Sequence, residues 1–174
     1  MVVRKRLELH GPALVFVTTT IQEWTPIFQE EKLASLIVSQ LKETIEHYRV
    51  SLVGYVLMPS HLHMLLGFKE IGKLSRFMQS FKILSSKLLK DSIPKSISGK
   101  FFNKNNFRLW KPRFDDLIIT SEEQFRIKLN YIHFNPVKTG LVDNPTDWKY
   151  SSAGDWILEK PGLMPIDKDF TWID

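Results

Sequence analysis

Cysteine is absent from the 174-residue chain, which rules out several kinds of chemistry. Without a thiol, the protein has no disulfide framework, no thiolate zinc site and no cysteine nucleophile. Any bound metal must therefore sit on nitrogen and oxygen ligands. The length is typical of one domain, because burial of roughly two-thirds of the unfolded surface supports a core without covalent cross-links.

Long apolar runs are also missing. No run reaches the length of about eighteen residues that a membrane-spanning helix needs. The N-terminal stretch from Met1 to Arg6 does not continue into the sustained apolar segment of a secretory signal. We therefore expect a soluble, cytoplasmic protein that has no membrane partner.

Negative charge is scarce in the middle of the chain. The formal net charge is +5, but residues 69–113 hold twelve Lys or Arg against Glu70 and Asp91, so their local charge is +10. A basic block of this kind is typical of a protein that binds a polyanion, because neutralised phosphates release counterions. A solvated lysine-rich face would have the same composition, so charge alone leaves both interpretations open.

Hydrophobic periodicity predicts an α+β fold. Short β-branched and apolar runs indicate strands, and apolar residues at three- and four-residue spacing indicate helices. We expect strands at 13–20, 50–57, 61–68 and 116–120, and helices at 30–48, 71–90 and from Ser121 onwards, where Gln124 can complete a capping box. This order predicts a ferredoxin-like split βαβ arrangement, an antiparallel sheet with helices on one face.

Three details complete the expected organisation. In the helix at 71–90 the apolar stripe is expected to be Leu74, Phe77, Phe81, Leu84 and Leu88. Residues 91–106 are expected to form a flexible basic loop, and Pro136 to end or kink the third helix. Residues 1–142 should then form one domain, and residues 143–174 a C-terminal tail that packs on it.

Two histidines provide the first candidate site. His61 and His63 are two residues apart on a predicted strand, so their side chains point to the same face and can share one metal ion. A third ligand from Asn, Gln or a carboxylate would leave positions open for substrate oxygens. Histidine pairs of this spacing also occur as ordinary strand residues, so the spacing alone does not establish a metal site.

Tyr131 and Asn135 provide the second candidate site. Their four-residue spacing places the phenol and the amide on the same face of the third helix. Asn135 is either a third metal ligand or the N-cap of a helical turn that begins at Pro136. Tyr131 alone would equally suit a half-buried aromatic residue with a hydrogen-bonded hydroxyl.

Two segments together resemble a known family. Residues 55–66, YVLMPSHLHMLL, are similar to the "VMPNHxHLLL" signature of the single-tyrosine HUH transposases. Residues 131–142, YIHFNPVKTGLV, are similar to the "YIxxNPVRAGLV" segment of the REP-associated tyrosine transposases. Segments 77–82, 110–115 and 148–152 add to the resemblance, which covers nearly the whole chain. Ser60, Lys138 and Thr139 depart from the usual Asn, Arg and Ala.

This resemblance implies a specific activity. Tyr131 would be the nucleophile, and His61, His63 and Asn135 would hold Mg²⁺ or Mn²⁺. The protein would cleave and rejoin single-stranded DNA near imperfect hairpins through a 5′-phosphotyrosine intermediate, without a nucleotide cofactor. It would be a monomer rather than a dimer, in the bacterial cytoplasm and at the nucleoid when bound to DNA. The expected DNA-binding residues are Arg76, Gln79, Lys82, Lys87, Lys100 and Lys104.

Two alternatives remain at this point. A domesticated protein that binds hairpins without cleaving them would need the basic block but not Tyr131 together with both histidines. A metal-dependent phosphodiesterase that uses water as its nucleophile would need the histidines but not the tyrosine.

Overall fold

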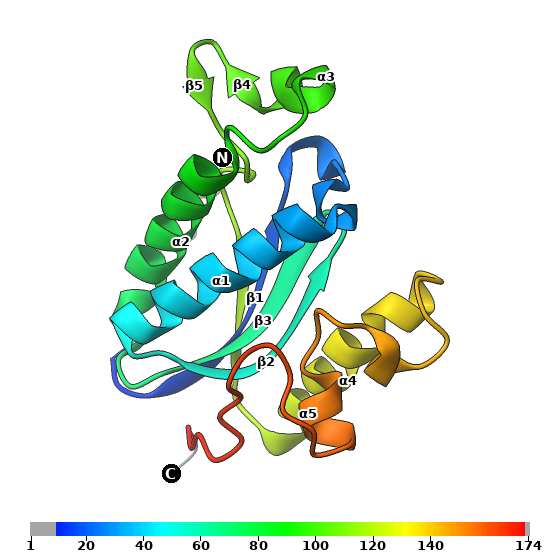
Figure 1. Ribbon diagram of the computed structural model, residues 1–174. Helices are drawn as coiled ribbons and strands as arrows, with labels where there is room; N and C mark the ends of the chain where they lie inside the picture. The colour runs from blue at the N-terminus through cyan, green and yellow to red at the C-terminus, as the bar shows by residue number, and fades with distance from the viewer. Residues whose placement is uncertain (1–9, 173–174) are drawn as a thin grey trace.

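A four-stranded antiparallel sheet forms the centre of the protein. The computed structural model describes residues 10–172, and the sheet has the order β2-β3-β1-β6 (Figure 1). Its strands are β1 (Ala13–Thr20), β2 (Ser51–Met58), β3 (His61–Phe68) and β6 (Asp115–Ile119). Adjacent strands are antiparallel throughout, which is the arrangement of a split βαβ fold. The predicted fold class is therefore confirmed.

Helices cover both faces of this sheet. The helices α1 (Glu31–Tyr48) and α2 (Leu74–Leu89) lie side by side on one face, as expected, whereas α4 (Glu122–Lys138) lies against the opposite face (Figure 1). The sequence analysis expected helices on one face only, so the position of α4 on the other face differs from that expectation. The physical reason is that β2 and β3 are buried along almost their whole length, so the side chains on both of their faces need cover.

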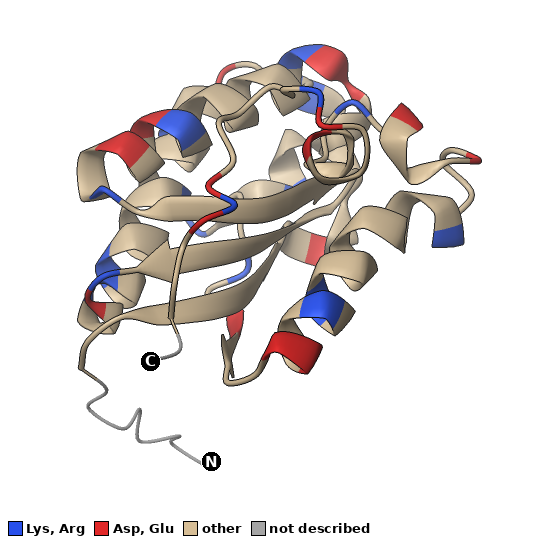
Figure 2. Cartoon of the chain, turned by 90° about the horizontal axis from the view of Figure 1, so that it is seen from below, with Lys and Arg blue, Asp and Glu red and all other residues tan. Residues whose placement is uncertain are grey.

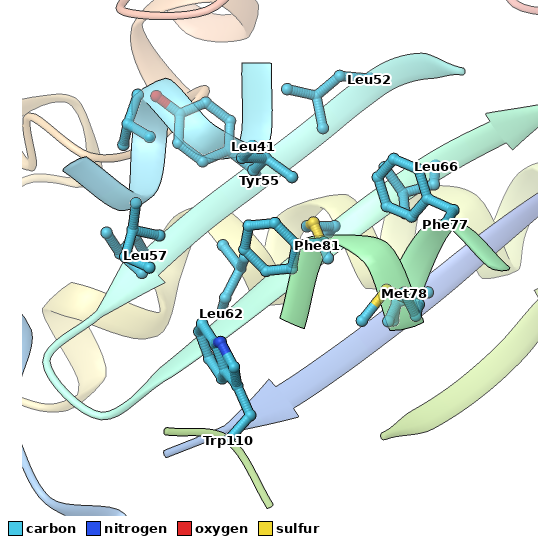
Figure 3. Close-up of a cluster of buried hydrophobic side chains, with 14 of the residues drawn as sticks. Leu41, Leu52, Tyr55, Leu57, Leu62, Leu66, Phe77, Met78, Phe81 and Trp110 are labelled. Carbon is cyan, nitrogen blue, oxygen red and sulfur yellow. The ribbon is translucent and has the colours of Figure 1, made fainter. Parts of the chain in front are cut away.

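The larger core lies between the sheet and the α1–α2 pair. Leu62 and Leu66 of β3 lie close to Phe77 and Phe81 of α2 (Figure 3). The buried stripe of α2 differs from the prediction, because Leu84 and Leu88 are 44% and 40% exposed while Ser85 and Leu89 are buried. The hydroxyl of Ser85 accepts a 2.8 Å hydrogen bond from the indole Nε1 of Trp110, which explains why a polar residue takes this core position.

The ends of α4 follow local side-chain chemistry. Ser121 is the N-cap, and its hydroxyl accepts a hydrogen bond from the backbone N–H of Gln124 at 3.1 Å, as predicted. The side chain of Gln124 accepts from the backbone N–H of Thr120, one residue before the position expected for a capping box. Pro136 lies inside the helix, which continues to Lys138, so the helix does not end at the proline.

The predicted flexible loop is folded. Residues 91–106 contain a short helix, a 3-10 turn and a strand pair that project from one end of the molecule (Figure 1). Ile93 and Phe101 are buried, which anchors this segment to the core. The remaining short elements of the described chain are η1 (Gln22–Trp24), η2 (Ile27–Gln29), η3 (Ile71–Lys73), α3 (Lys95–Ser98), η4 (Gly99–Phe101), β4 (Phe102–Asn103), β5 (Asn106–Phe107), η5 (Pro145–Asp147) and α5 (Ala153–Ile157).

The C-terminal segment lies along the outer edge of the sheet. The backbone N–H of Leu57 donates a hydrogen bond to the carbonyl of Tyr150, and that of Asp167 donates one to the carbonyl of Leu52, both at 2.8 Å. The indole of Trp156 donates to the Val53 carbonyl at 2.8 Å. These bonds satisfy backbone groups that an open edge strand would expose for pairing with another chain.

Charged residues lie mainly outside the sheet. The four strands carry no Lys or Arg, and their only acidic residues are Asp115 and Asp116 of β6 (Figure 2). Lysine and arginine are carried by helices and connecting segments. Within residues 10–172, no helix combines the length and the apolar character needed to cross a membrane.

A substitution at Gly67 can test how the C-terminal segment packs on the sheet. A Cβ atom at Gly67 would lie 2.7 Å from the ring of Phe170, whereas a Cβ at Gly72 has open space. We expect Gly67→Ala to lower the free energy of unfolding by about 1–3 kcal/mol, the usual cost of overpacking. Gly72→Ala is the control, and urea unfolding is the measurement. In a Phe170→Ala background the cost of Gly67→Ala should disappear; an equal cost there would contradict the packing.

Candidate active site

His61 and His63 lie on the sheet face that α4 covers. Their strand neighbours Leu62 and Met64 point into the α1–α2 core, so the alternation of β3 sends both histidines to the other side. The two imidazole centroids are 4.7 Å apart, with the rings edge to face. The structure therefore brings the two predicted ligands together.

A hydroxyl group orients each imidazole. Thr18 of β1 lies directly opposite His63, and its Oγ1 is 2.7 Å from the Nδ1 of that histidine. The Oγ of Ser60 is 3.2 Å from the Nδ1 of His61. A metal-bound histidine typically uses one ring nitrogen for such a tether and the other for the metal. Thr18 was not predicted from the sequence, because its role depends on the register between β1 and β3.

The second ring nitrogen of His63 fits a ligand role. Its Nε2 is buried and has no hydrogen-bond partner among the described residues. Burial lowers the pKa of His63 to about 3, and positive charge on His61 and Lys128 adds to this effect. Burial also lowers the pKa of His61. Both rings are therefore neutral at pH 7, and neutral imidazole is the form that binds metal.

Tyr131 lies beside the histidine pair. Its ring centroid is 5.2 Å from that of His63, and the side chain is 38% exposed. Leu129 and Ile132, which flank this position on α4, are buried against the sheet and so fix the helix there. A phenol that is near the metal-binding nitrogens and still accessible has the placement that a nucleophile needs.

Two lysines on α4 add positive charge near the tyrosine. The Nζ atoms of Lys128 and Lys138 each lie 5.7 Å from the Tyr131 ring centroid. Lys128 was not singled out from the sequence, although its position three residues before Tyr131 places it on the same helical face. These charges suit a phosphate group at the tyrosine.

Asn135 lies one turn after Tyr131 inside α4 and is 7% exposed. The helix continues through it, so the interpretation of Asn135 as a helix N-cap is wrong. Its backbone carbonyl accepts hydrogen bonds from the N–H and the hydroxyl of Thr139. Residues 10–172 contain no group of three or more His, Cys, Asp or Glu that could hold a metal. A third protein ligand must therefore be of another type, and an amide such as that of Asn135 stays a prediction.

The predicted DNA-binding residues occupy different environments. Arg76, Gln79, Lys87 and Lys104 are exposed, and Lys100 lies 3.9 Å from Glu23. Lys82 is different, because its ammonium group donates to the carbonyls of Lys111, Pro112 and Arg113 at 2.5, 3.1 and 3.3 Å. Burial lowers the pKa of Lys82 to about 8. These contacts tie the 111–113 segment to α2, which favours a structural role for Lys82.

A basic groove lies between α2 and the segment 107–112. It has a volume of about 330 Å³, and no acidic side chain lines it. Its apolar wall includes Ile83, Phe107 and Pro112. The basic residues that line it are Lys82, Lys87, Lys90, Arg108 and Lys111.

Comparisons with known proteins identify relatives of this chain. Residues 13–135 match the family described as "Transposase IS200 like", a stretch that contains His61, His63, Tyr131 and Asn135. A Haemophilus influenzae protein named as a REP-associated tyrosine transposase is 29% identical over 144 residues, which is 80% of this chain and 78% of that protein. The REP-associated tyrosine transposase of Escherichia coli is 37% identical over 59 residues, or 34% of each chain.

Two solved structures share the fold. A REP-associated tyrosine transposase bound to a REP hairpin superposes with a TM-score of 0.66 and 18% identity, covering 97% of this chain and 93% of that one. A transposase from Deinococcus radiodurans has a TM-score of 0.52 and 17% identity, covering 76% and 95%. The family match extends over most of the chain and includes His61, His63, Tyr131 and Asn135, and the chain therefore belongs to the IS200-like transposase family and is similar to its REP-associated tyrosine members.

Proposed function

We propose that this protein is a metal-dependent strand transferase that cleaves and rejoins single-stranded DNA near hairpins. The observation that carries the proposal is the accessible Tyr131 ring 5.2 Å from His63, whose buried Nε2 has no partner among the described residues. A hairpin-binding protein without activity would need neither feature, and a hydrolase that uses water would need only the second.

The reaction would proceed by direct displacement at phosphorus. The Tyr131 oxygen attacks a phosphodiester, the bond to the 3′-oxygen breaks, and the products are a 5′-phosphotyrosine and a free 3′-hydroxyl. The phenol loses its proton and the leaving oxygen gains one, so no proton is consumed overall. The ester conserves the energy of the bond, and attack by another 3′-hydroxyl reverses the step without nucleotide hydrolysis.

The residues around Tyr131 have separate parts in this scheme. His61 and His63, together with Asn135, would hold Mg²⁺ or Mn²⁺. When bound, this ion supplies Lewis-acid polarisation of the scissile phosphate. Lys128 and Lys138 attract the phosphate to the tyrosine. The hydroxyls of Thr18 and Ser60 hold the two imidazoles so that each presents Nε2.

The proposed DNA partner is a single strand that carries an imperfect hairpin. One relative of the same fold is described as bound to a REP hairpin, and the basic block of this chain suits a phosphate backbone. We propose that the protein acts as a monomer, and that it is associated with the nucleoid when it is bound to DNA.

The first prediction concerns Tyr131. With labelled hairpin DNA from the ends flanking its own gene and Mn²⁺, the wild-type protein should become covalently labelled on a denaturing gel. Tyr131→Phe removes the attacking oxygen, so label should fall by at least about 10³-fold. Tyr48→Phe is the control, since its hydroxyl bonds to Ser80 on the other side of the sheet. EDTA should abolish the label. Cleavage by Tyr131→Phe at the wild-type rate would instead indicate water as the nucleophile.

The second prediction concerns the tether on His63. Thr18→Val leaves Nδ1 without its partner, so Mn²⁺ affinity measured by electron paramagnetic resonance should fall about 10- to 100-fold. Thr19→Val is the matched control, because the buried Thr19 hydroxyl has no partner among the described residues and lies opposite Leu62. The same loss in both variants, or none in Thr18→Val, would refute the tether.

The third prediction separates two lysines of α2. Lys87→Met should weaken hairpin binding and reduce the salt dependence of log K by about 0.9, with stability unchanged. Lys82→Met should lower the free energy of unfolding by about 1–3 kcal/mol, because three carbonyls lose a charged donor. Fluorescence anisotropy and urea unfolding provide the measurements. If Lys82→Met weakened binding at unchanged stability, its assigned structural role would be wrong.

A further inference from the structure

Trp24 is an exposed aromatic residue next to the histidine pair. Its side chain is 54% exposed, and its ring centroid lies 5.5 Å from that of His61 in an edge-to-face arrangement. Tyr131 contacts His63, the other member of the pair. Trp24 and Tyr131 therefore contact opposite members of the pair, and neither the fold nor the proposed chemistry uses the indole.

The backbone holds Trp24 in an unusual conformation. Glu23 and Trp24 have φ values of 54° and 55°, in the left-handed region that bulky residues rarely adopt. Backbone hydrogen bonds hold the chain just before it: the N–H of Ile21 donates to the Ser60 carbonyl at 2.9 Å, and that of Gln22 to the Leu109 carbonyl at 3.0 Å. Just after it, the N–H of Thr25 donates back to the Gln22 carbonyl at 3.1 Å. Such strain persists only where surrounding structure enforces it, and it is concentrated at ligand sites.

Positive charge extends from Trp24 into the basic groove. The Nζ of Lys111 lies 4.6 Å from the Trp24 ring centroid. Lys111 also lines the groove between α2 and segment 107–112, together with Lys87, Lys90 and Arg108. An aromatic platform beside a basic groove is the usual way to bind unpaired nucleic acid, because bases stack while lysine and arginine neutralise the phosphates.

We propose that Trp24 is a stacking platform for one unpaired base of the DNA substrate. Because the Trp24 ring lies 5.5 Å from that of His61, the stacked base would belong to a nucleotide close to the scissile phosphate. The strand then continues past Lys111 into the groove. This inference rests on the proposed function, because it assigns the position of its single-stranded substrate.

The test measures binding without cleavage. Single-stranded oligonucleotides carrying the fluorescent base 2-aminopurine at successive positions next to the hairpin are titrated in EDTA with wild type, Trp24→Ala and Trp24→Phe. Ile157→Ala on α5, at a residue 49% exposed, is the matched control. Thermal unfolding establishes that each variant is folded.

In the wild type we expect quenching at one position, caused by stacking on the indole. Trp24→Ala should abolish that quenching and weaken binding about 5- to 150-fold, the usual range for one stacked base. Trp24→Phe should retain most of the affinity, and Ile157→Ala should behave as the wild type.

Three results would overturn the platform. These are an unchanged affinity in Trp24→Ala, a loss of affinity with no position-specific change in fluorescence, and a wild type that does not bind the single strand. The covalent labelling assay is independent of this test. A labelled wild type with no effect of Trp24→Ala rejects the platform alone, whereas quenching without covalent label rejects the strand-transfer chemistry alone.

Discussion

The burial of β3 on both faces is the constraint on which the rest of the structure depends. One row of its side chains, including Leu62 and Leu66, completes the core under α1 and α2. The other row begins with His61 and His63, which share their face with Leu65. That face needs an apolar cover, and α4 provides it with Leu129 and Ile132. The helix that closes this second core therefore also delivers Tyr131 to the histidines.

The same packing prepares the histidines for chemistry. Their burial keeps the rings neutral, and hydroxyl groups from β1 and from the β2–β3 turn hold one nitrogen of each ring. The strand register decides which hydroxyl is available, since Thr18 lies opposite His63. The cost of this arrangement is a buried Nε2 without a partner in the described part of the chain. Most buried polar atoms have a partner, which makes this nitrogen a candidate ligand atom, and four other buried side-chain atoms of the described residues, including the Thr19 hydroxyl, are also unpaired.

The sequence predicts the elements better than it predicts their surroundings. Strand and helix periods and the shared face of the two histidines followed from residue spacing, because spacing determines which side chains share a face. The association of the histidine pair with Tyr131 followed from the family resemblance, not from spacing. The position of α4 could have been inferred from the nearly continuous apolar runs of β2 and β3. The roles of Thr18 and Trp24 could not have been inferred from the sequence. That of Thr18 depends on the register between β1 and β3, and that of Trp24 depends on the pairing of Ile21 with Trp110. The role of Lys82 depends on carbonyls about thirty residues away.

The basic groove beside α2 is lined by neither the histidine pair nor Tyr131, and this separation favours the proposed catalytic function over a binding module. The sheet strands carry no Lys or Arg (Figure 2), so the proposed phosphate contacts would lie on the helices and connecting segments, such as the groove beside α2. Hairpin binding at these surfaces would not need His63 or an accessible Tyr131. A binding module would gain stability from an apolar residue at position 63, because an unsatisfied buried nitrogen destabilises the fold. The unpaired imidazole therefore supports the proposed metal site more than it supports a hairpin-binding module.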